Sequence, residues 1–183
     1  MKIITTPIEG ILIIEPKTFK DKRGFFMETY NQDRYNAFGI NATFVQDNLS
    51  YSLKNTLRGL HFQIKHPPAK LIQVSSGEIF DVAVDLRTGF ATFGKWIGIH
   101  LSGENRRQVF IPEGFAHGFC VLSKFALFHY KCSDFYKPDD EGGILWSDSD
   151  IGIEWPVKNP IISEKDKQYQ KLSDLTAEQL PSF

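Results

Sequence analysis

Short runs in which apolar and polar residues alternate recur along most of the chain, and residues typical of turns separate them. The clearest run is Ile79–Leu86 (IFDVAVDL), in which Phe80, Val82, Val84 and Leu86 fall on one face. A period of two residues indicates a β-strand. The same criteria predict strands at Ile8–Glu15, Phe25–Tyr30, Ala42–Ser52, Lys70–Ser75, Thr92–Leu101, Gln108–Ile111, Gly118–Leu122 and Phe125–Cys132.

Helical signals are few and short. Gln32–Ala37 follows Asn31, a possible N-cap, and Gly39 stops it, while Thr176 and Gln179 fit a capping box in the tail. Many short strands separated by turns, with almost no helix, predict an all-β sandwich or barrel. We expect a single domain over residues 1–183.

Composition narrows the class of protein. The chain has 183 residues and a formal charge of −1, and its 21 basic and 22 acidic residues form no long run. This balance predicts no nucleic-acid partner and no membrane-surface partner. The two cysteines, Cys120 and Cys132, are too few for a disulfide framework. No stretch is apolar enough to span a membrane, so we expect a soluble cytoplasmic protein.

Candidate chemistry concentrates in Leu57–Lys70 (LRGLHFQIKHPPAK). Arg58 offers a planar fork for phosphate or carboxylate, and His61 is the side chain most easily poised for proton transfer. Alternation places Gly59 and His61 on one face and Arg58 on the other. The following strand can return Lys70 to His61, and a base beside a cation can form and hold an enolate. A core histidine remains the competing interpretation.

Two further groups of polar residues leave alternatives open. The run Gln46–Ser52 either faces solvent or lines a polar pocket. On Ile79–Leu86, Asp81 and Asp85 share a face and need water, a cation or a histidine, because burying an unpaired carboxylate is costly. A mononuclear metal site is possible only through distant partners, since Gln63 stands where a His-x-His pair would place its second ligand.

Several motifs in order resemble a known family. Pro112-x-Gly114-x-x-His117 is similar to the second half of the cupin signature, whereas the first half lacks its metal ligands. The other motifs are Asp21-x-Arg23-Gly24-Phe25-Phe26, Gln46-Asp47-Asn48, Arg58–Gln63, Lys70, Asp81–Arg87, Tyr130-Lys131 and Ser163–Asp166. Together, from about Ile8 to Asp166, they resemble the dTDP-4-dehydrorhamnose 3,5-epimerases, a metal-free branch of the cupins.

The resemblance implies a cupin-type jelly roll that acts as a homodimer. N-terminal strands, about residues 1–30, would lie in the dimer contact, and the tail, about 157–183, would pack on the barrel. The implied reaction inverts C3 and C5 of dTDP-4-dehydro-6-deoxy-D-glucose to give dTDP-4-dehydro-L-rhamnose, a precursor of cell-surface rhamnose. Neither a cofactor nor a metal is implied.

The resemblance also implies roles for individual residues. The match to His61 is the base and that to Asp166 its partner, while Tyr130 would be the acid on the opposite face and Lys70 would face the enolate oxygen. Tyr136 would stack on the thymine. Contacts to the nucleotide sugar would come from Arg23, Phe26, Glu28, Gln46, Asp47, Asn48, Arg58, His117, Glu141 and Lys165.

Three other functions remain open from sequence. A relative that inverts only C3 or only C5 would use the same acid and base. A metal-dependent cupin enzyme would be revealed by metal analysis. A non-catalytic sugar-binding module would disperse His61, Lys70 and Tyr130 instead of gathering them in one pocket.

Overall fold

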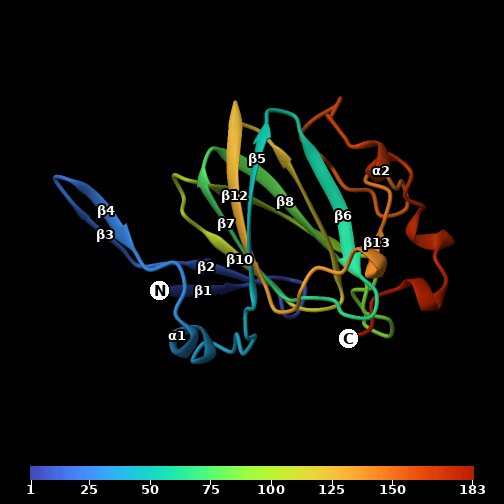
Figure 1. Ribbon diagram of the computed structural model, residues 1–183, viewed down its shortest axis with the longest axis horizontal. Coiled ribbons are helices and arrows are strands. Elements are labelled where there is room, and N and C mark those ends of the chain that lie inside the picture. Colours follow the sequence, from blue (N-terminus) through green and yellow to red (C-terminus); the bar gives the residue numbers. More distant parts are fainter.

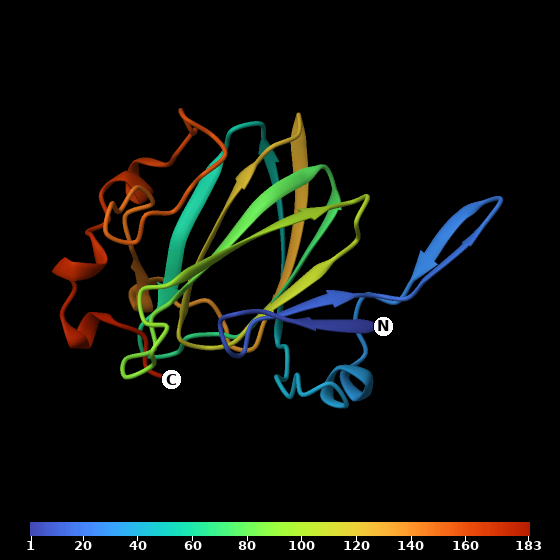
Figure 2. The same ribbon diagram turned by 180° about the vertical axis from the view of Figure 1, so that it is seen from behind.

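The computed structural model describes all residues, 1–183, and is built from two facing antiparallel sheets (Figures 1 and 2). The six-stranded sheet runs in the order β1 (Lys2–Thr5), β2 (Leu12–Glu15), β10 (Gln108–Ile111), β7 (Lys70–Ser76), β12 (Phe125–Cys132), β5 (Gln46–Leu53). The five-stranded sheet runs β13 (Glu141–Gly143), β6 (Leu57–Gln63), β11 (Phe115–Val121), β8 (Glu78–Asp85), β9 (Trp96–Ser102). The predicted all-β sandwich is confirmed.

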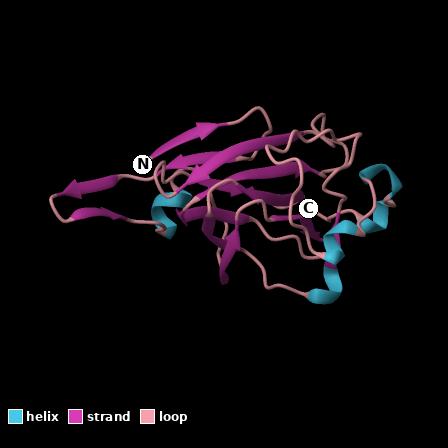
Figure 3. Cartoon of the chain, turned by 90° about the horizontal axis from the view of Figure 1, so that it is seen from above, coloured by secondary structure: helices cyan, strands magenta, loops and turns pink.

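Helices are short and lie at the periphery (Figure 3). Helix α1 (Gln32–Asn36) begins after Asn31, whose side-chain oxygen accepts a hydrogen bond from the Arg34 N–H at 3.1 Å, as predicted. The other helical segments are α2 (Glu164–Lys167), η1 (Pro138–Asp140), η2 (Leu172–Asp174) and η3 (Ala177–Gln179), and the predicted capping box is present at η3. No helix in the protein has the length and apolar character needed to cross a membrane.

The two sides of β8 are both buried, for different reasons. Ile79 and Ala83 face the other sheet and join the main core. Val82, Val84 and Leu86 face outward and form a second core, against which tail residues such as Leu172 pack. The C-terminal segment also bonds to the sandwich, because the Ser182 N–H donates to the Ile64 carbonyl at 2.7 Å.

Several predicted boundaries were wrong. Gly10, at φ +94°, turns the chain inside the predicted first strand, so that β2 begins only at Leu12. No strand was predicted between Glu15 and Phe25, but β3 (Thr18–Asp21) lies there and pairs with β4 (Gly24–Met27). The strand predicted at Gly118–Leu122 begins earlier, since β11 (Phe115–Val121) includes His117. Strand β13 and helix α2 were not predicted, because both depend on contacts with distant β6.

Exposed apolar side chains gather on the β3–β4 hairpin and on β5. The β3–β4 hairpin projects from the sandwich (Figure 1), and Phe26 on it is 69% exposed. Strand β5 is an edge strand whose outward side chains Leu49, Tyr51 and Leu53 are all exposed. Exposed apolar side chains grouped in this way mark interaction surfaces.

A buried ion pair fixes the end of β8. Asp85, which is 0% exposed, accepts hydrogen bonds from Arg87 Nε at 2.9 Å, Arg87 Nη2 at 2.7 Å and Thr92 Oγ1 at 2.6 Å. The Arg87 guanidinium also lies over the Phe90 and Phe115 rings at 4.1 and 4.5 Å. The cation that the sequence required for Asp85 is therefore Arg87.

Replacing Arg87 by Leu should leave the Asp85 carboxylate buried without its cation. We expect the free energy of unfolding to fall by about 3–5 kcal/mol, measured by urea denaturation. As a control, Lys167→Ala removes an exposed ion pair with Glu164 and should leave stability nearly unchanged. Equal losses in the two variants would contradict this account of the β8 end.

Candidate active site

A pocket of about 790 Å³ lies between the two sheets. Its five-stranded wall carries Arg58, His61 and His117. Its six-stranded wall carries Lys70 and Tyr130. The other predicted site residues that line it are Gln46, Asn48, Tyr136, Glu141, Lys165 and Asp166. The structure thus gathers His61, Lys70 and Tyr130, the arrangement that a dispersed binding module would not show.

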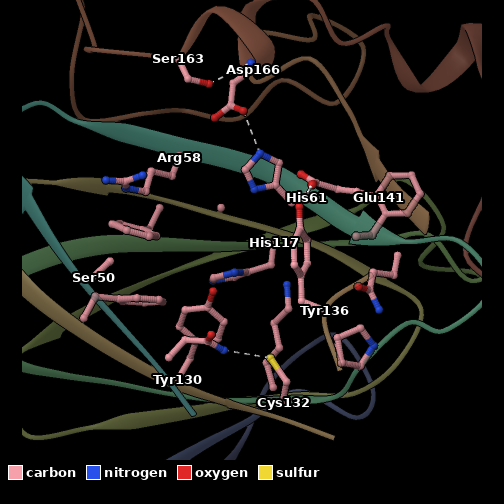
Figure 4. Close-up of a pocket in the computed structure, with 18 of the residues that line it drawn as sticks. Ser50, Arg58, His61, His117, Tyr130, Cys132, Tyr136, Glu141, Ser163 and Asp166 are labelled. Atoms are coloured by element: carbon pink, nitrogen blue, oxygen red, sulfur yellow. Dashed lines mark hydrogen bonds and ion pairs between the residues drawn. The ribbon is translucent and has the colours of Figure 1, made fainter. Parts of the chain in front are cut away.

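His61 forms a dyad with Asp166. The Nε2 atom of His61 lies 2.8 Å from Asp166 Oδ1, and the Gly59 N–H donates to Asp166 Oδ2 at 3.1 Å. Burial raises the pKa of Asp166, but the hydrogen bonds and charge of His61 and the Gly59 N–H outweigh it and leave the pKa below its usual value. An ionised Asp166 requires a proton on Nε2, so in the neutral imidazole Nδ1 carries the lone pair. Figure 4 shows this second nitrogen directed into the pocket.

Asp166 lies on the short helix α2, and an N-cap hydrogen bond stabilises the start of that helix. Ser163 is the N-cap of α2, and its hydroxyl accepts a hydrogen bond from the Asp166 N–H at 3.1 Å. Ser163 precedes Asp166 by three residues, so this capping signal was available in the sequence. The signal is weak by itself, because a helix of four residues has no apolar periodicity of its own.

Arg58 and His61 line the same pocket, which corrects the prediction that they face opposite ways. The register of β6 against β11 shifts between the pairs His117–His61 and Phe119–Arg58. Two residues separate Arg58 from His61, whereas one separates His117 from Phe119, so β6 carries an extra residue there. Such a bulge re-aims side chains. Strict alternation fails at this point.

The opposite wall supplies a cation and a phenol. Lys70 Nζ has no hydrogen-bond or ion-pair partner in the structure. Burial lowers the pKa of Lys70, although its electrostatic interactions with Cys132, Asp81 and Glu141 oppose that effect. Burial raises the pKa of Tyr130, so its hydroxyl stays protonated and can donate. Figure 4 shows Tyr130 and Cys132 across the pocket from His61 and Asp166.

His117 is held by Asp81. Its Nε2 atom lies 2.9 Å from Asp81 Oδ2, and both side chains are buried. Burial lowers the pKa of His117, against the opposing effect of Asp81. The partner that the sequence required for Asp81 is therefore a histidine, which itself lies directly opposite His61 in the sheet register.

A second network surrounds Glu141 on β13. The Tyr136 hydroxyl donates to Glu141 Oε2 at 2.6 Å, and Lys165 Nζ lies 2.6 Å from the same oxygen. Burial raises the pKa of Glu141, but the hydrogen bonds from Lys165 and Tyr136 outweigh it and lower the pKa. The bond to Glu141 raises the pKa of Tyr136 to about 12. Gln46 Oε1 accepts the Tyr136 N–H at 2.9 Å, which ties this loop to β5.

The polar run on β5 faces both ways. Gln46, Asn48 and Ser50 line the pocket, whereas Asp47 points outward and pairs with Lys131 Nζ at 2.7 Å. Asp47 is therefore outside the pocket of its own chain. Ser50, unlike Gln46 and Asn48, was not predicted as a site residue, although its place in the alternation could have identified it.

Arg23, Phe26 and Glu28 do not line the pocket. Arg23 pairs with Asp21 at 2.6 Å in the projecting hairpin, and Glu28 pairs with Arg34 at 3.0 Å. Within one chain these three residues lie apart from His61. Their predicted contact with the nucleotide sugar stays a prediction that requires a second copy of the chain.

Two pocket features carry no predicted role. Cys132 Sγ accepts a weak hydrogen bond from Asn48 Nδ2 at 3.7 Å. The Gln63 amide hydrogen-bonds to three backbone groups. Its Nε2 donates to the His66 carbonyl at 2.7 Å and to the Phe135 carbonyl at 3.3 Å. Its Oε1 accepts from the Lys137 N–H at 2.7 Å. The structure contains no group of three or more His, Cys, Asp or Glu side chains that could hold a metal.

The sequence and the fold match known proteins over nearly their whole length. The family model described as dTDP-4-dehydrorhamnose 3,5-epimerase matches residues 5–174. A dTDP-4-dehydrorhamnose 3,5-epimerase from Shigella flexneri is 56% identical over 176 residues, covering 95% of this chain and 97% of that protein. A dTDP-4-dehydrorhamnose 3-epimerase from Streptomyces niveus is 38% identical, covering 95% and 85% respectively.

A solved structure is also similar. A dTDP-6-deoxy-D-glucose-3,5-epimerase from Legionella pneumophila Philadelphia 1, in complex with dTDP-4-keto-L-rhamnose, superposes with a TM-score of 0.96. It is 49% identical, and the match covers 100% of this chain and 98% of that chain. The sandwich is thus the cupin-type fold of these epimerases.

Lys70 should titrate below the ordinary lysine value of about 10.4, because burial disfavours its ammonium form. NMR of protein carrying labelled lysine side chains measures this directly. Asp81→Asn should lower the Lys70 pKa further, since it removes a negative charge, whereas Asp150→Asn at an exposed site should not change it. Titration of Lys70 at or above the ordinary value would contradict the prediction.

Proposed function

The chain belongs to the dTDP-4-dehydrorhamnose 3,5-epimerase family, and we propose that it converts dTDP-4-dehydro-6-deoxy-D-glucose to dTDP-4-dehydro-L-rhamnose. The enzyme is then an isomerase that inverts C3 and C5 of the sugar. The observation that carries the proposal is the placement of His61 and Tyr130 on facing walls of one pocket. Inversion needs one group to remove a proton and another to deliver one to the opposite face.

His61 acts as the general base through Nδ1. Its Nε2–H is held by Asp166, which fixes the tautomer and stabilises the imidazolium that forms. The protons at C3 and C5 are both α to the C4 ketone, so removing either one gives an enolate on the same oxygen. One base therefore suffices for both carbons.

Lys70 stabilises the enolate. Its ammonium has no partner within the protein and is free to donate to the C4 oxygen as negative charge develops there. A fixed cation in a pocket that excludes water is worth more than in solvent, and it acts at both proton-removal steps. This chemistry requires no redox or carbonyl-trapping group, which is why we expect neither a cofactor nor a metal.

Tyr130 acts as the general acid. Its pKa is raised by burial, so the phenol is protonated at neutral pH, and it projects from the sheet opposite His61. A proton delivered from this wall reaches the face that His61 does not serve. The configuration at the carbon is then inverted.

The remaining pocket residues bind the nucleotide. Arg58, whose Nε donates to Ser52 Oγ at 3.0 Å, is held in place to contact the diphosphate by charge-assisted hydrogen bonds. Tyr136 stacks on the thymine. The sugar and nucleotide contacts are completed by Gln46, Asn48, His117, Glu141 and Lys165.

A homodimer completes the site. The projecting β3–β4 hairpin and the exposed apolar face of β5 are surfaces that a second copy would cover. Arg23, Phe26 and Glu28 would then reach the partner's pocket, and Asp47 would lie in the contact. That the enzyme acts in the cytoplasm likewise stays a prediction.

Incubation of the protein with the keto-sugar nucleotide in heavy water, followed by NMR, tests the proposal. We expect deuterium at both C3 and C5 together with inversion at both carbons. Inversion at one carbon only would favour the second candidate function, a mono-epimerase. The similarity to the Streptomyces niveus 3-epimerase supports that candidate. No exchange at either carbon would reject the epimerase function.

The two variants His61→Asn and Tyr130→Phe should differ in heavy water. His61→Asn removes the base, so exchange and inversion should both fall by at least about 10²-fold. Tyr130→Phe keeps His61 and Lys70, so the enolate still forms and His61 returns a solvent-derived deuteron to the original face. Exchange should therefore outlast inversion in Tyr130→Phe. Parallel loss of both would assign Tyr130 to enolate formation instead.

Mixing two impaired variants tests the dimer. If Arg23 serves the partner's pocket, a heterodimer of His61→Asn and Arg23→Ala chains has one intact site. Random pairing of equal amounts should then restore roughly a quarter of wild-type turnover at low substrate concentration. If Arg23 serves its own chain, no heterodimer contains an intact site, and mixing restores nothing.

A further inference from the structure

Tyr169 packs on the proposed base from outside the pocket. Its ring centroid lies 5.8 Å from that of the His61 imidazole, with an interplanar angle of 67°, an edge-to-face arrangement. The residue is partly buried and does not line the pocket between the sheets. It therefore contacts the base without access to the substrate.

A glycine makes room for this ring. Gly143 on β13 lies directly opposite His61 in the sheet register. A Cβ atom built on Gly143 would overlap the Tyr169 ring. Gly143 does not have a positive φ, so the backbone does not require glycine there. The feature that requires glycine at position 143 is the ring that lies against it.

The hydroxyl of Tyr169 connects the base to the Glu141 network. It donates to Glu141 Oε1 at 3.3 Å, whereas the Tyr136 hydroxyl and Lys165 Nζ both lie at the other oxygen, Oε2. Burial raises the pKa of Tyr169, so the phenol remains a donor. One carboxylate thus holds Tyr169 on one side and two proposed nucleotide-binding residues on the other.

We propose that Tyr169 is a positioning residue that holds the imidazole of His61 in the orientation from which Nδ1 faces the sugar. The inference rests on the proposed epimerase function and adds a residue to it. Of the two imidazole nitrogens, Asp166 forms a hydrogen bond with Nε2 only, so the imidazole ring can still change its orientation about that bond. The Tyr169 ring, fixed over Gly143 and tethered to Glu141, blocks this motion.

Proton removal from carbon depends steeply on geometry. A displacement of about 1 Å can cost about 100-fold in rate, even when the altered residue is not itself reactive. Substrate binding depends mainly on other residues in the pocket. Loss of the Tyr169 ring should therefore lower kcat while KM changes little.

Three variants and a matched control test the proposal. Tyr169→Leu removes the ring, and Gly143→Ala displaces it while leaving Tyr169 in the chain. Tyr169→Phe keeps the ring and removes only the hydroxyl. The control is Phe183→Leu, since Phe183 makes a similar edge-to-face contact with Phe90, at 5.8 Å and 71°, remote from the pocket between the sheets.

We expect Tyr169→Leu and Gly143→Ala to lose about ten- to a hundredfold in kcat at nearly constant KM. Tyr169→Phe should recover most of that loss, and Phe183→Leu should keep the wild-type kcat. A wild-type kcat in Tyr169→Leu, or a loss confined to KM, would overturn the proposal. So would a kcat loss in Phe183→Leu as large as that in Tyr169→Leu.

The downfield proton NMR signal of His61 Nε2–H supplies a readout that needs no substrate. It should broaden in Tyr169→Leu and Gly143→Ala, because a less tightly held Nε2–H exchanges faster with water, and it should stay sharp in Tyr169→Phe and Phe183→Leu. An unchanged signal in folded Tyr169→Leu protein would overturn the positioning role. A wild-type protein that shows this signal but does not turn over the keto-sugar nucleotide would instead contradict the proposed function.

Discussion

The hydrogen bond between Asp166 and His61 joins the C-terminal tail to the sandwich, and the proposed chemistry depends on it. His61 belongs to the sandwich, whereas Asp166 arrives on a short helix more than a hundred positions later in the chain. The same carboxylate accepts the Gly59 N–H, so it also fixes β6 at the point where the register shifts. The His61–Asp166 pair therefore forms only when the tail has folded onto the sheet.

In a sandwich whose pocket lies between the sheets, the groups on one pocket wall come from one sheet and those on the facing wall come from the other. Side chains that point inward from one sheet face those from the other, and an occupant meets a different set of groups on each side. Here the five-stranded sheet supplies a histidine and the six-stranded sheet supplies a lysine and a tyrosine. For a reaction that must exchange a proton between two faces of one sugar, the fold itself provides the geometry.

Much of this arrangement could be predicted from sequence, and the failures have identifiable causes. Alternation correctly predicted β8, β10 and β12, and the motifs anticipated the pocket positions of His61, Lys70, Tyr130 and Asp166. Strict alternation placed Arg58 on the wrong side, because a bulge at the β6–β11 pairing is set by tertiary contacts. Arg23 pairs with Asp21 in the projecting hairpin and does not line the pocket of the single chain, so its predicted contact with the nucleotide sugar stays a prediction.

The central claim is that one sugar ring lies between His61 and Tyr130. A crystal structure of the protein with bound dTDP-4-dehydro-L-rhamnose tests it most directly. The account predicts His61 Nδ1 and Tyr130 Oη on opposite faces of the ring, with Lys70 Nζ within hydrogen-bond distance, about 2.6–3.2 Å, of the C4 oxygen. A ring with both His61 and Tyr130 on the same face, or with its C4 oxygen turned away from Lys70, would contradict it.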